Sequence, residues 1–269
     1  MKLIILLLIL SLSHALASDK LVFGAISTID PYVMKKKLSP IINYLEMVTG
    51  KKVEFQTGYD YTDTIKKFAD GTFDIGYIGP APYVITKQIN PESIHIVAGL
   101  VNDKNKPFQS VIISKKGSDS TKLDDIKNRR FAFGSPQSTL SYFVPMNMLI
   151  KADVVNKVKS YDFLGRHDKV AQYIIMGKYD VGAVKKSVAE KYSKYIQVVA
   201  SSQELPDFMI VANNSVQRET VEKIKHALLN LKDAQILKSL KASAVGFEER
   251  KDSDYDDLRL IIENVKKYK

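Results

Sequence analysis

Residues 131–145 read Phe-Ala-Phe-Gly-Ser-Pro-Gln-Ser-Thr-Leu-Ser-Tyr-Phe-Val-Pro, the pattern of a buried strand that turns into a helix. The apolar run 131–133 predicts the strand, and Gly-Ser-Pro at 134–136 predicts the turn. Ser138 or Thr139 can cap the helix that follows. A strand, a short loop and a helix in that order form the repeating unit of α/β folds.

The same stretch carries no charged residue between positions 131 and 150. The first turn of a helix usually recruits Asp or Glu, because the N-terminal end of the helix dipole is positive. A helix start with hydroxyls and no carboxylate is suited to holding an external anion such as phosphate or a phosphonate. A plain serine-capped helix is the alternative interpretation.

Strand and helix signals alternate outside this stretch as well. Residues 20–26 have the continuous apolar character of a buried parallel strand, and amphipathic segments follow it. The alternation predicts an α/β protein whose mostly parallel sheets are flanked by helices.

A short internal repeat indicates two lobes of similar construction. Gly, Asp and Gly at 71, 74 and 76 recur at 177, 180 and 182, although an echo this short can also arise by chance. Strand-like runs at 110–114 and 208–212 are the expected crossings between lobes. We therefore predict one lobe from 18–108 plus 209–269 and a second from 109–208, with a ligand cleft between them.

The N-terminus has the features of a secretory signal. Lys2 precedes an apolar run over 3–12, and Ala15-Leu16-Ala17 predicts cleavage after Ala17. The run is short for a membrane span, although an uncleaved anchor is the alternative. The chain has no Cys, so we expect neither disulfides nor a lipid-attachment cysteine, and a freely diffusing periplasmic protein.

The net charge of +10 arises mainly from lysine, since only six of the forty basic residues are Arg. No dense basic block interleaved with aromatic residues is present, so nucleic-acid binding is weakly supported. A solvated lysine-rich surface is the default explanation, with modest steering of anionic solutes.

Motifs for catalysis are missing from the sequence. It contains no Gly-x-Ser-x-Gly elbow, no phosphate-binding loop ending in Gly-Lys-Ser/Thr and no His-Glu-x-x-His helix. His95, His167 and His226 are far apart in sequence, so we expect no metal site, no cofactor and no enzymatic activity. His167 and Tyr61 each stand at a predicted helix start, where each can donate to a ligand or simply cap and pack.

Three segments give the chain a family resemblance. Residues 135–141 resemble an Asp-Pro-x-Ser-Thr-Ser-Gly loop, and Gly-Arg-His-Asp at 165–168 and Asp-Ile-Gly-Tyr-Ile-Gly-Pro at 74–80 accompany it. Together they resemble the phosphate, phosphite and phosphonate-binding proteins of bacterial ABC transporters. The resemblance covers essentially the whole mature chain and implies a two-lobed type II periplasmic binding fold.

The resemblance also implies a set of ligand-binding residues. Ser138 and Thr139 would hold phosphoryl oxygens, and Tyr61 and His167 would add donors from the first and second lobe. Asp207 falls where an aminophosphonate binder keeps a carboxylate for the ligand amine. The segment 74–80 would bring Tyr77 and Ile78 to the same site.

Several positions depart from the family pattern. Leu140 replaces a serine, and Phe108 stands where some members place a tyrosine that binds ligand. Ser187 replaces a second carboxylate, and Lys185 and Lys186 beside it have the wrong sign for an amine. These departures disfavour 2-aminoethylphosphonate and leave phosphate, phosphite or a small alkylphosphonate, or a different ligand that suits a less polar pocket.

The expected function is therefore capture of a small phosphorus oxyanion and its delivery to an inner-membrane permease, by a protein that the resemblance implies is a monomer. A sensory receptor that docks on a membrane histidine kinase is the first alternative. An exported enzyme acting on phosphate esters is the second, and it would need a nucleophile or metal set that the sequence does not show.

Overall fold

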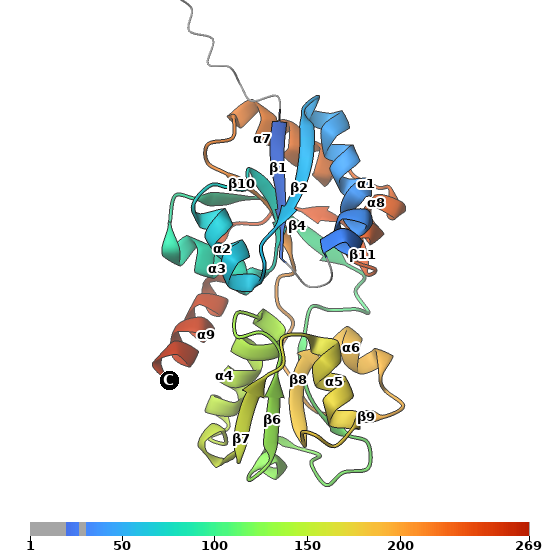
Figure 1. Ribbon diagram of the computed structural model, residues 1–269, viewed down its shortest axis with the longest axis vertical. Coiled ribbons are helices and arrows are strands. Elements are labelled where there is room, and N and C mark those ends of the chain that lie inside the picture. Colours follow the sequence, from blue (N-terminus) through green and yellow to red (C-terminus); the bar gives the residue numbers. More distant parts are fainter. Residues whose placement is uncertain (1–19, 27–30, 269) are drawn as a thin grey trace, which may run out of the picture.

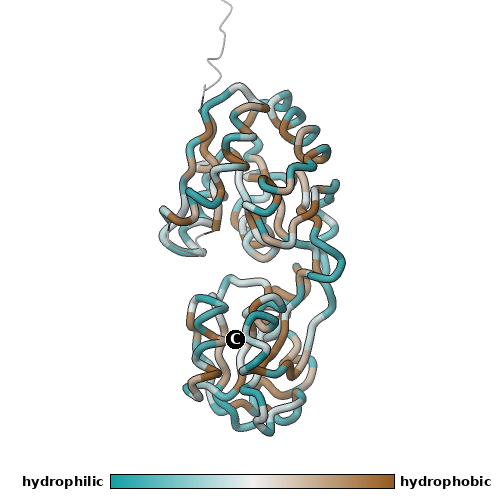
Figure 2. The backbone as a smooth tube through the Cα atoms, turned by 90° about the vertical axis from the view of Figure 1, so that its right-hand side faces the viewer, coloured by the Kyte–Doolittle hydropathy of each residue, from teal (hydrophilic) through white to brown (hydrophobic). Residues whose placement is uncertain are grey.

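The computed structural model describes residues 20–26 and 31–268, and these residues form two lobes (Figure 1). The leader predicted over 1–17 lies outside the described residues. Figure 2 shows the lobes one above the other, with the connecting segments along one side. Within the described residues, no helix is both long enough and apolar enough to cross a bilayer.

The first lobe is built on a mixed sheet with the strand order β11-β4-β10-β3-β1-β2. Strands β2, β1 and β3 are parallel, whereas β10 runs antiparallel to both β3 and β4, and β11 runs antiparallel to β4. The strands are β1 (Lys20–Ala25), β2 (Lys52–Thr57), β3 (Ile75–Ile78), β4 (Ile94–Asn102), β10 (Met209–Asn213) and β11 (Ala244–Glu248).

Helices cover both faces of this sheet. On one face α1, α7 and α8 pack together and close an apolar cluster with the strands. On the other face α2 and α3 contribute Phe68, Tyr83 and Val84 to a second cluster. The helices are α1 (Pro31–Thr49), α2 (Tyr61–Ala69), α3 (Pro80–Ile89), α7 (Arg218–Leu229) and α8 (Ala234–Leu240).

The second lobe has a sheet of the same kind, with the order β7-β6-β8-β5-β9. Strands β7, β6 and β8 are parallel, and β5 is antiparallel to β8 and β9. The strands are β5 (Ser110–Lys115), β6 (Arg130–Phe133), β7 (Ser160–Phe163), β8 (Val181–Lys185) and β9 (Ile196–Ser201). The helical segments are η1 (Leu123–Ile126), η2 (Thr139–Phe143), α4 (Val144–Lys151), η3 (Val155–Lys157), α5 (His167–Ile175) and α6 (Lys186–Lys191).

Segments 103–109 and 202–208 carry the chain between the lobes (Figure 1). They run side by side, because the backbone N–H of Leu205 donates to the carbonyl of Phe108 at 3.0 Å. Each segment enters its new lobe as a strand that is antiparallel to its neighbours, which explains why the sheets are mixed. The two-lobed α/β fold predicted from the sequence is confirmed.

The last helix, α9 (Asp256–Lys267), follows η4 (Asp252–Tyr255) and contacts both α3 and α4. Its buried side chains Leu258, Ile262 and Val265 belong to an apolar cluster that also contains residues of α3, η2 and α4. The side-chain amide of Asn264 donates to the side-chain oxygen of Asn147 at 2.7 Å. The C-terminal helix therefore ties the two lobes together on one side of the molecule (Figure 1).

The internal repeat has a structural counterpart in the two lobes. A side-chain oxygen of Asp74 accepts from the backbone N–H of Val22 in β1 at 2.7 Å, and that of Asp180 accepts from the N–H of Arg130 in β6 at 2.8 Å. In each case the aspartate also donates its own N–H to the carbonyl of the same strand residue. Equivalent turns therefore start β3 and β8, the strands that lead to the cleft.

Candidate functional site

A cavity of about 1030 Å³ opens between the lobes. It lies at the carboxyl ends of the parallel strands β1, β3, β6 and β8, where ligands bind in open α/β sheets. The first lobe lines it with parts of α1, the start of α2 and the end of β3. The second lobe lines it with the loop after β6, the start of α5 and the end of β8.

The loop after β6 turns the chain from the sheet into η2 and α4. Ser138 is the N-cap, and its side-chain oxygen accepts from the N–H of Ser141 at 3.2 Å. The first turn is a π-helix, in which the N–H of Phe143 donates to the carbonyl of Ser138 at 3.1 Å. Wide first turns of this kind are frequent at functional sites. The cap predicted at 138 or 139 is confirmed at 138.

The backbone donors of this loop are available to a ligand. Among the described residues, the N–H groups of Thr139 and Leu140 have no protein acceptor, and both residues line the cavity. No charged side chain stands in the first turn of η2 or α4. The unsatisfied donors and the positive end of the helix dipole favour an anion here.

Two hydrogen bonds from this loop reach the first lobe. The N–H of Ala81, at the start of α3, donates to the side-chain oxygen of Thr139 at 2.9 Å. The side-chain amide of Gln137 donates to the hydroxyl of Thr62 in α2 at 3.0 Å. The Thr139 hydroxyl can still donate its own proton, because a hydroxyl can accept and donate at once.

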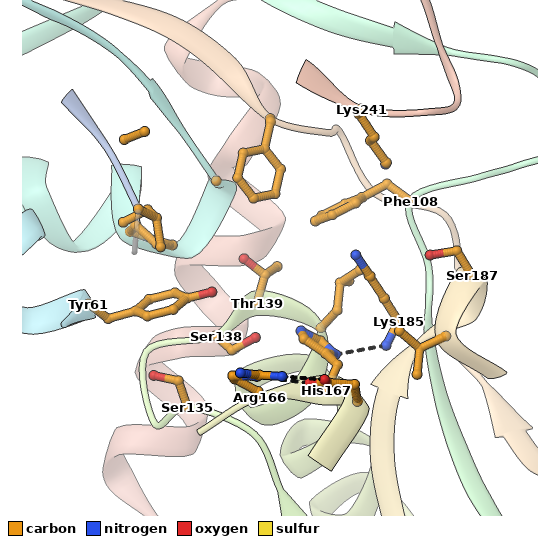
Figure 3. A pocket seen from close by; sticks show the side chains of 18 of the residues that line it. Tyr61, Phe108, Ser135, Ser138, Thr139, Arg166, His167, Lys185, Ser187 and Lys241 are labelled. Carbon is orange, nitrogen blue, oxygen red and sulfur yellow. Dashed lines mark hydrogen bonds and ion pairs between the residues drawn. The ribbon is translucent and has the colours of Figure 1, made fainter. Parts of the chain in front are cut away.

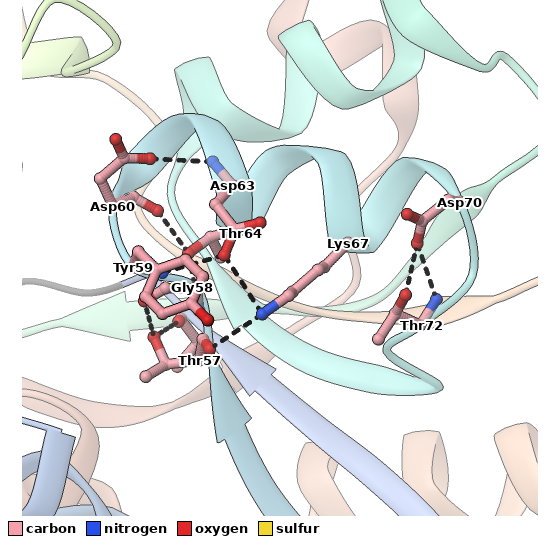
Figure 4. Close-up of polar contacts among 10 residues, drawn as sticks. Thr57, Gly58, Tyr59, Asp60, Asp63, Thr64, Lys67, Asp70 and Thr72 are labelled. Atoms are coloured by element: carbon pink, nitrogen blue, oxygen red, sulfur yellow. Dashed lines mark hydrogen bonds and ion pairs between the residues drawn. The ribbon is translucent and has the colours of Figure 1, made fainter.

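Tyr61 is the first residue of α2, and a network of hydrogen bonds shapes the start of this helix (Figure 4). Asp60 caps the helix by accepting from the N–H of Asp63 at 2.9 Å, and the hydroxyl of Thr64 donates to the carbonyl of Asp60 at 2.7 Å. Gly58 packs against the backbone of Thr64, where a Cβ would clash. The network fixes the direction in which Tyr61 leaves the helix.

The phenol of Tyr61 is a hydrogen-bond donor at neutral pH. Burial raises the pKa of Tyr61 to about 12, so the hydroxyl stays protonated. Figure 3 shows the hydroxyl directed toward Ser138 and Thr139 across the cavity. The first lobe therefore adds a donor opposite the helix start of the second lobe.

His167, the first residue of α5, adds a donor from the second lobe. Its Nδ1 accepts a 3.0 Å hydrogen bond from the backbone N–H of Lys185 (Figure 3). Burial, with the nearby charge of Lys185, lowers the pKa of His167 to about 3. The ring is neutral and carries its proton on Nε2, which makes Nε2 the donor. The adjacent Arg166 pairs with Asp168, with Nε donating to the carboxylate at 3.0 Å.

Aromatic side chains form another wall of the cavity. The rings of Tyr77 and Phe208 lie 4.8 Å apart, and Phe108 meets Phe208 edge to face at 5.9 Å between centroids. The ammonium group of Lys241 lies 5.0 Å from the centre of the Phe108 ring. Together with Leu140 these residues leave an apolar surface beside the polar loop.

Residues 23–255 match the model of a family described as the phosphonate periplasmic substrate-binding proteins of ABC transporters. This chain belongs to that family. The match spans both lobes and includes every element that lines the cavity.

Two curated relatives of the family carry more specific names. The chain is 26% identical over 210 residues to the phosphate-import protein PhnD of Mycolicibacterium smegmatis, covering 71% of this chain and 65% of that protein. It is 27% identical over 215 residues to a probable ABC transporter phosphite-binding protein, PhnD1, of Prochlorococcus marinus, covering 72% of this chain and 66% of that protein. The chain thus spans slightly less than two thirds of the length of these relatives.

A solved structure has the same fold as this chain. PhnD1 of Prochlorococcus marinus, in complex with methylphosphonate, superimposes with a TM-score of 0.80 at 24% identity and covers 93% of this chain and 99% of that one. The aliphatic sulphonate-binding protein SsuA of Escherichia coli is more distant, with a TM-score of 0.60 at 15% identity, covering 91% of this chain and 78% of that one. The type II periplasmic binding fold expected from the sequence is confirmed.

The structure brings most of the sequence-predicted residues of this family member to the cavity. The residues that line it are Tyr61, Tyr77, Phe108, Ser138, Thr139, Leu140 and His167. Their role in binding stays a prediction.

Ile78 and Asp207 do not line the cavity. Ile78 is fully buried in the core of the first lobe. The Asp207 carboxylate is buried, pairs with Lys241, and accepts from the side-chain amide of Asn102 and from the N–H of Phe208. These partners hold the carboxylate away from a ligand amine.

Sequence reasoning assigned no binding role to many of the residues that line the cavity, among them Lys37, Gln137 and Arg166. Gln137 lies inside the loop that resembles the family motif, and Arg166 lies beside His167. Nothing in the local sequence distinguishes Lys37 from the other lysines of its helix.

Proposed function

We propose that this protein captures a small phosphorus oxyanion in its cleft and delivers it to the permease of an ABC transporter. The uncharged helix start at 138–140, with hydroxyls and unpaired N–H groups, is the observation that carries the proposal. Tyr61 and His167 supply neutral donors that face it. Hydrogen bonds to a charged group are strong when the site excludes water, and they need no basic side chain.

Phosphate, phosphite or a small alkylphosphonate is the ligand class that we propose. The two curated relatives are named for phosphate import and for phosphite binding, and a solved relative holds methylphosphonate. An aminophosphonate fits less well, because Asp207 is already paired with Lys241 and Lys185 stands at the cavity.

Closure of the lobes is the proposed binding motion. Residues 18–108 with 209–269 would move as one unit and 109–208 as the other, about the segments 103–109 and 202–208. Because α9 contacts both α3 and α4, this motion would shift α9 against one of these two helices. Such hinge motions enclose the ligand and remove water from its hydrogen bonds. We also propose export, cleavage after Ala17 and a monomeric protein in the periplasm.

Transport is preferred to the sensory alternative, because the family description names a transporter component. The same description, of a substrate-binding protein, supports a role without enzymatic turnover. The mature protein can be tested for turnover with a chromogenic phosphate ester, and release of the chromophore would count against the proposal.

The binding experiment is calorimetric titration of the ligand-stripped mature protein with phosphate, phosphite and methylphosphonate, with sulfate as the control anion. We expect at least one phosphorus compound to bind at micromolar affinity or tighter, which is roughly 8 kcal/mol. Ser138→Ala combined with Thr139→Ala should abolish this binding, and the surface variant Ser193→Ala should not. If no phosphorus compound binds, the proposal is wrong.

A further inference from the structure

The cleft has more positive charge than a single phosphoryl group requires. Of the described residues that line it, seven are Lys or Arg and three are acidic. The donors at the helix start, Tyr61 and His167 are all neutral, so this charge lies outside the phosphoryl-binding loop. The extra cations need a separate explanation.

Two of the cations that line the cavity, Lys185 and Lys37, come from different lobes. Lys185 ends β8 in the second lobe, and Lys37 lies in α1 of the first lobe. Among the described residues, neither ammonium group has a carboxylate within ion-pair distance. The acids whose charges act on Lys185, Asp207 and Asp168, are already paired with Lys241 and Arg166.

The side chains of both lysines remain exposed to solvent in the cleft, and nearby positive charge disfavours the charged form of Lys185. Partial desolvation lowers the pKa of Lys185, and the charges of Lys241 and Lys37 lower it further. Partial desolvation also lowers the pKa of Lys37. An anion placed among the lysines would relieve the repulsion, whereas an amine would increase it.

Lys185 also lies next to the phosphoryl-binding residues. Its backbone N–H donates to Nδ1 of His167 at 3.0 Å, so the two residues are adjacent. Figure 3 shows the residue between His167 and Phe108. A group joined to phosphorus by a short carbon chain can run along the apolar surface of Phe108 and reach this position.

We propose that the cleft takes a phosphonate with a second anionic group, and that Lys185 and Lys37 hold this group, one from each lobe. The inference rests on the proposed function, because it assumes that the phosphorus atom lies at the helix start. A carboxylate two carbons from phosphorus is the simplest such ligand. Because the two lysines belong to different lobes, the second group also favours the closed form.

Three ligands that differ only at the tail test this inference by calorimetry. 3-Phosphonopropionate, n-propylphosphonate and 2-aminoethylphosphonate share the phosphonate and two methylene groups, and they end in a carboxylate, a methyl and an ammonium group. We expect the affinity for the carboxylate compound to exceed that for the methyl compound by about tenfold or more, because its tail forms charge-assisted hydrogen bonds. We expect the ammonium compound to bind most weakly.

Variants then assign the preference to the lysines. Lys185→Gln and, separately, Lys37→Gln should each reduce the preference for the carboxylate over the methyl tail, while affinity for n-propylphosphonate changes little. Lys36→Gln is the matched control, because Lys36 is the exposed neighbour of Lys37 on α1 and does not line the cavity. It removes the same charge and should leave the preference intact.

The outcomes separate this inference from the proposed function. If n-propylphosphonate and methylphosphonate bind but the carboxylate tail brings no gain, the inference is wrong and the proposed function stands. If Lys36→Gln reduces the preference as much as Lys185→Gln, general charge steering replaces a specific subsite. If no phosphorus compound binds at all, the proposed function itself fails.

Discussion

The backbone N–H of Ala81 donates to the side-chain oxygen of Thr139 at 2.9 Å and so joins the helix starts of α3 and η2 across the two lobes. Both residues are buried. The hydroxyl of Thr139 accepts from one lobe and keeps its proton for the cavity. One side chain can therefore link ligand binding to the relative position of the lobes.

Removal of the Thr139 hydroxyl is expected to affect both stability and binding. Thr139→Val keeps the shape but leaves the N–H of Ala81 buried without an acceptor, which costs about 1–3 kcal/mol of stability. It should also weaken methylphosphonate binding by about tenfold or more. Thr139→Ser keeps the hydroxyl and should retain most of the stability and most of the affinity. Urea unfolding and calorimetry measure the two effects, and wild-type affinity in Thr139→Val would exclude a direct ligand contact.

The hydroxyl of Tyr61 is expected to contribute to affinity but little to folding. Tyr61→Phe removes a donor that faces the cavity and keeps the ring, so methylphosphonate affinity should fall about tenfold with little change in Tm. Tyr195→Phe, at an exposed position outside the cavity, is the control and should bind like the wild type. Equal affinity for the two variants would remove Tyr61 from the site.

The neutral state of His167 should make stability depend on pH. The pKa is about 3 in the folded protein and near 6.5 in an unfolded chain. The unfolded state therefore takes up a proton first as pH falls, and the contribution of His167 to stability, complete above about 6.5, is lost progressively toward pH 3.

This effect can be measured as Tm against pH between 7 and 4 in the absence of ligand. His167→Gln cannot titrate, so its Tm should fall less steeply than that of the wild type, by a few degrees over this range. His226→Gln, at an exposed position on α7, should follow the wild-type curve. Parallel curves for wild type and His167→Gln would show that His167 is protonated at its ordinary pKa.

The equivalent aspartates of the two lobes should have similar effects on stability. Asp74→Ala leaves the N–H of Val22 without its side-chain acceptor, and Asp180→Ala does the same for Arg130. Asp180→Ala also removes an exposed ion pair with the Arg130 guanidinium, which contributes little. Each change should cost about 1–3 kcal/mol in urea unfolding. Because the two sites lie in different lobes, the loss of unfolding free energy in the double variant should be about the sum of the two single losses. If only one of the two single variants loses stability, the two turns are not energetically equivalent.

The sequence by itself determined the two-lobed α/β fold and the position of the loop that we propose binds the anion. Strand, turn and cap signals act over a few residues, so the turn at 134–136 and the cap at Ser138 could be predicted from neighbours along the chain. The repeat of Asp74 at Asp180 could be recognised along the chain, but the hydrogen bonds that these aspartates accept from Val22 and Arg130 span 52 and 50 residues, and only the structure shows them.

Only the tertiary structure decided which charges face the cleft. Asp207 has the sequence position of a ligand residue, but its partners Lys241 and Asn102 lie 34 and 105 residues away and hold it outside the cavity. Lys185 and Lys37 come from different lobes and line the same cavity only because the lobes face each other. Pairings of this kind depend on distances between elements remote in sequence, and no local pattern encodes them.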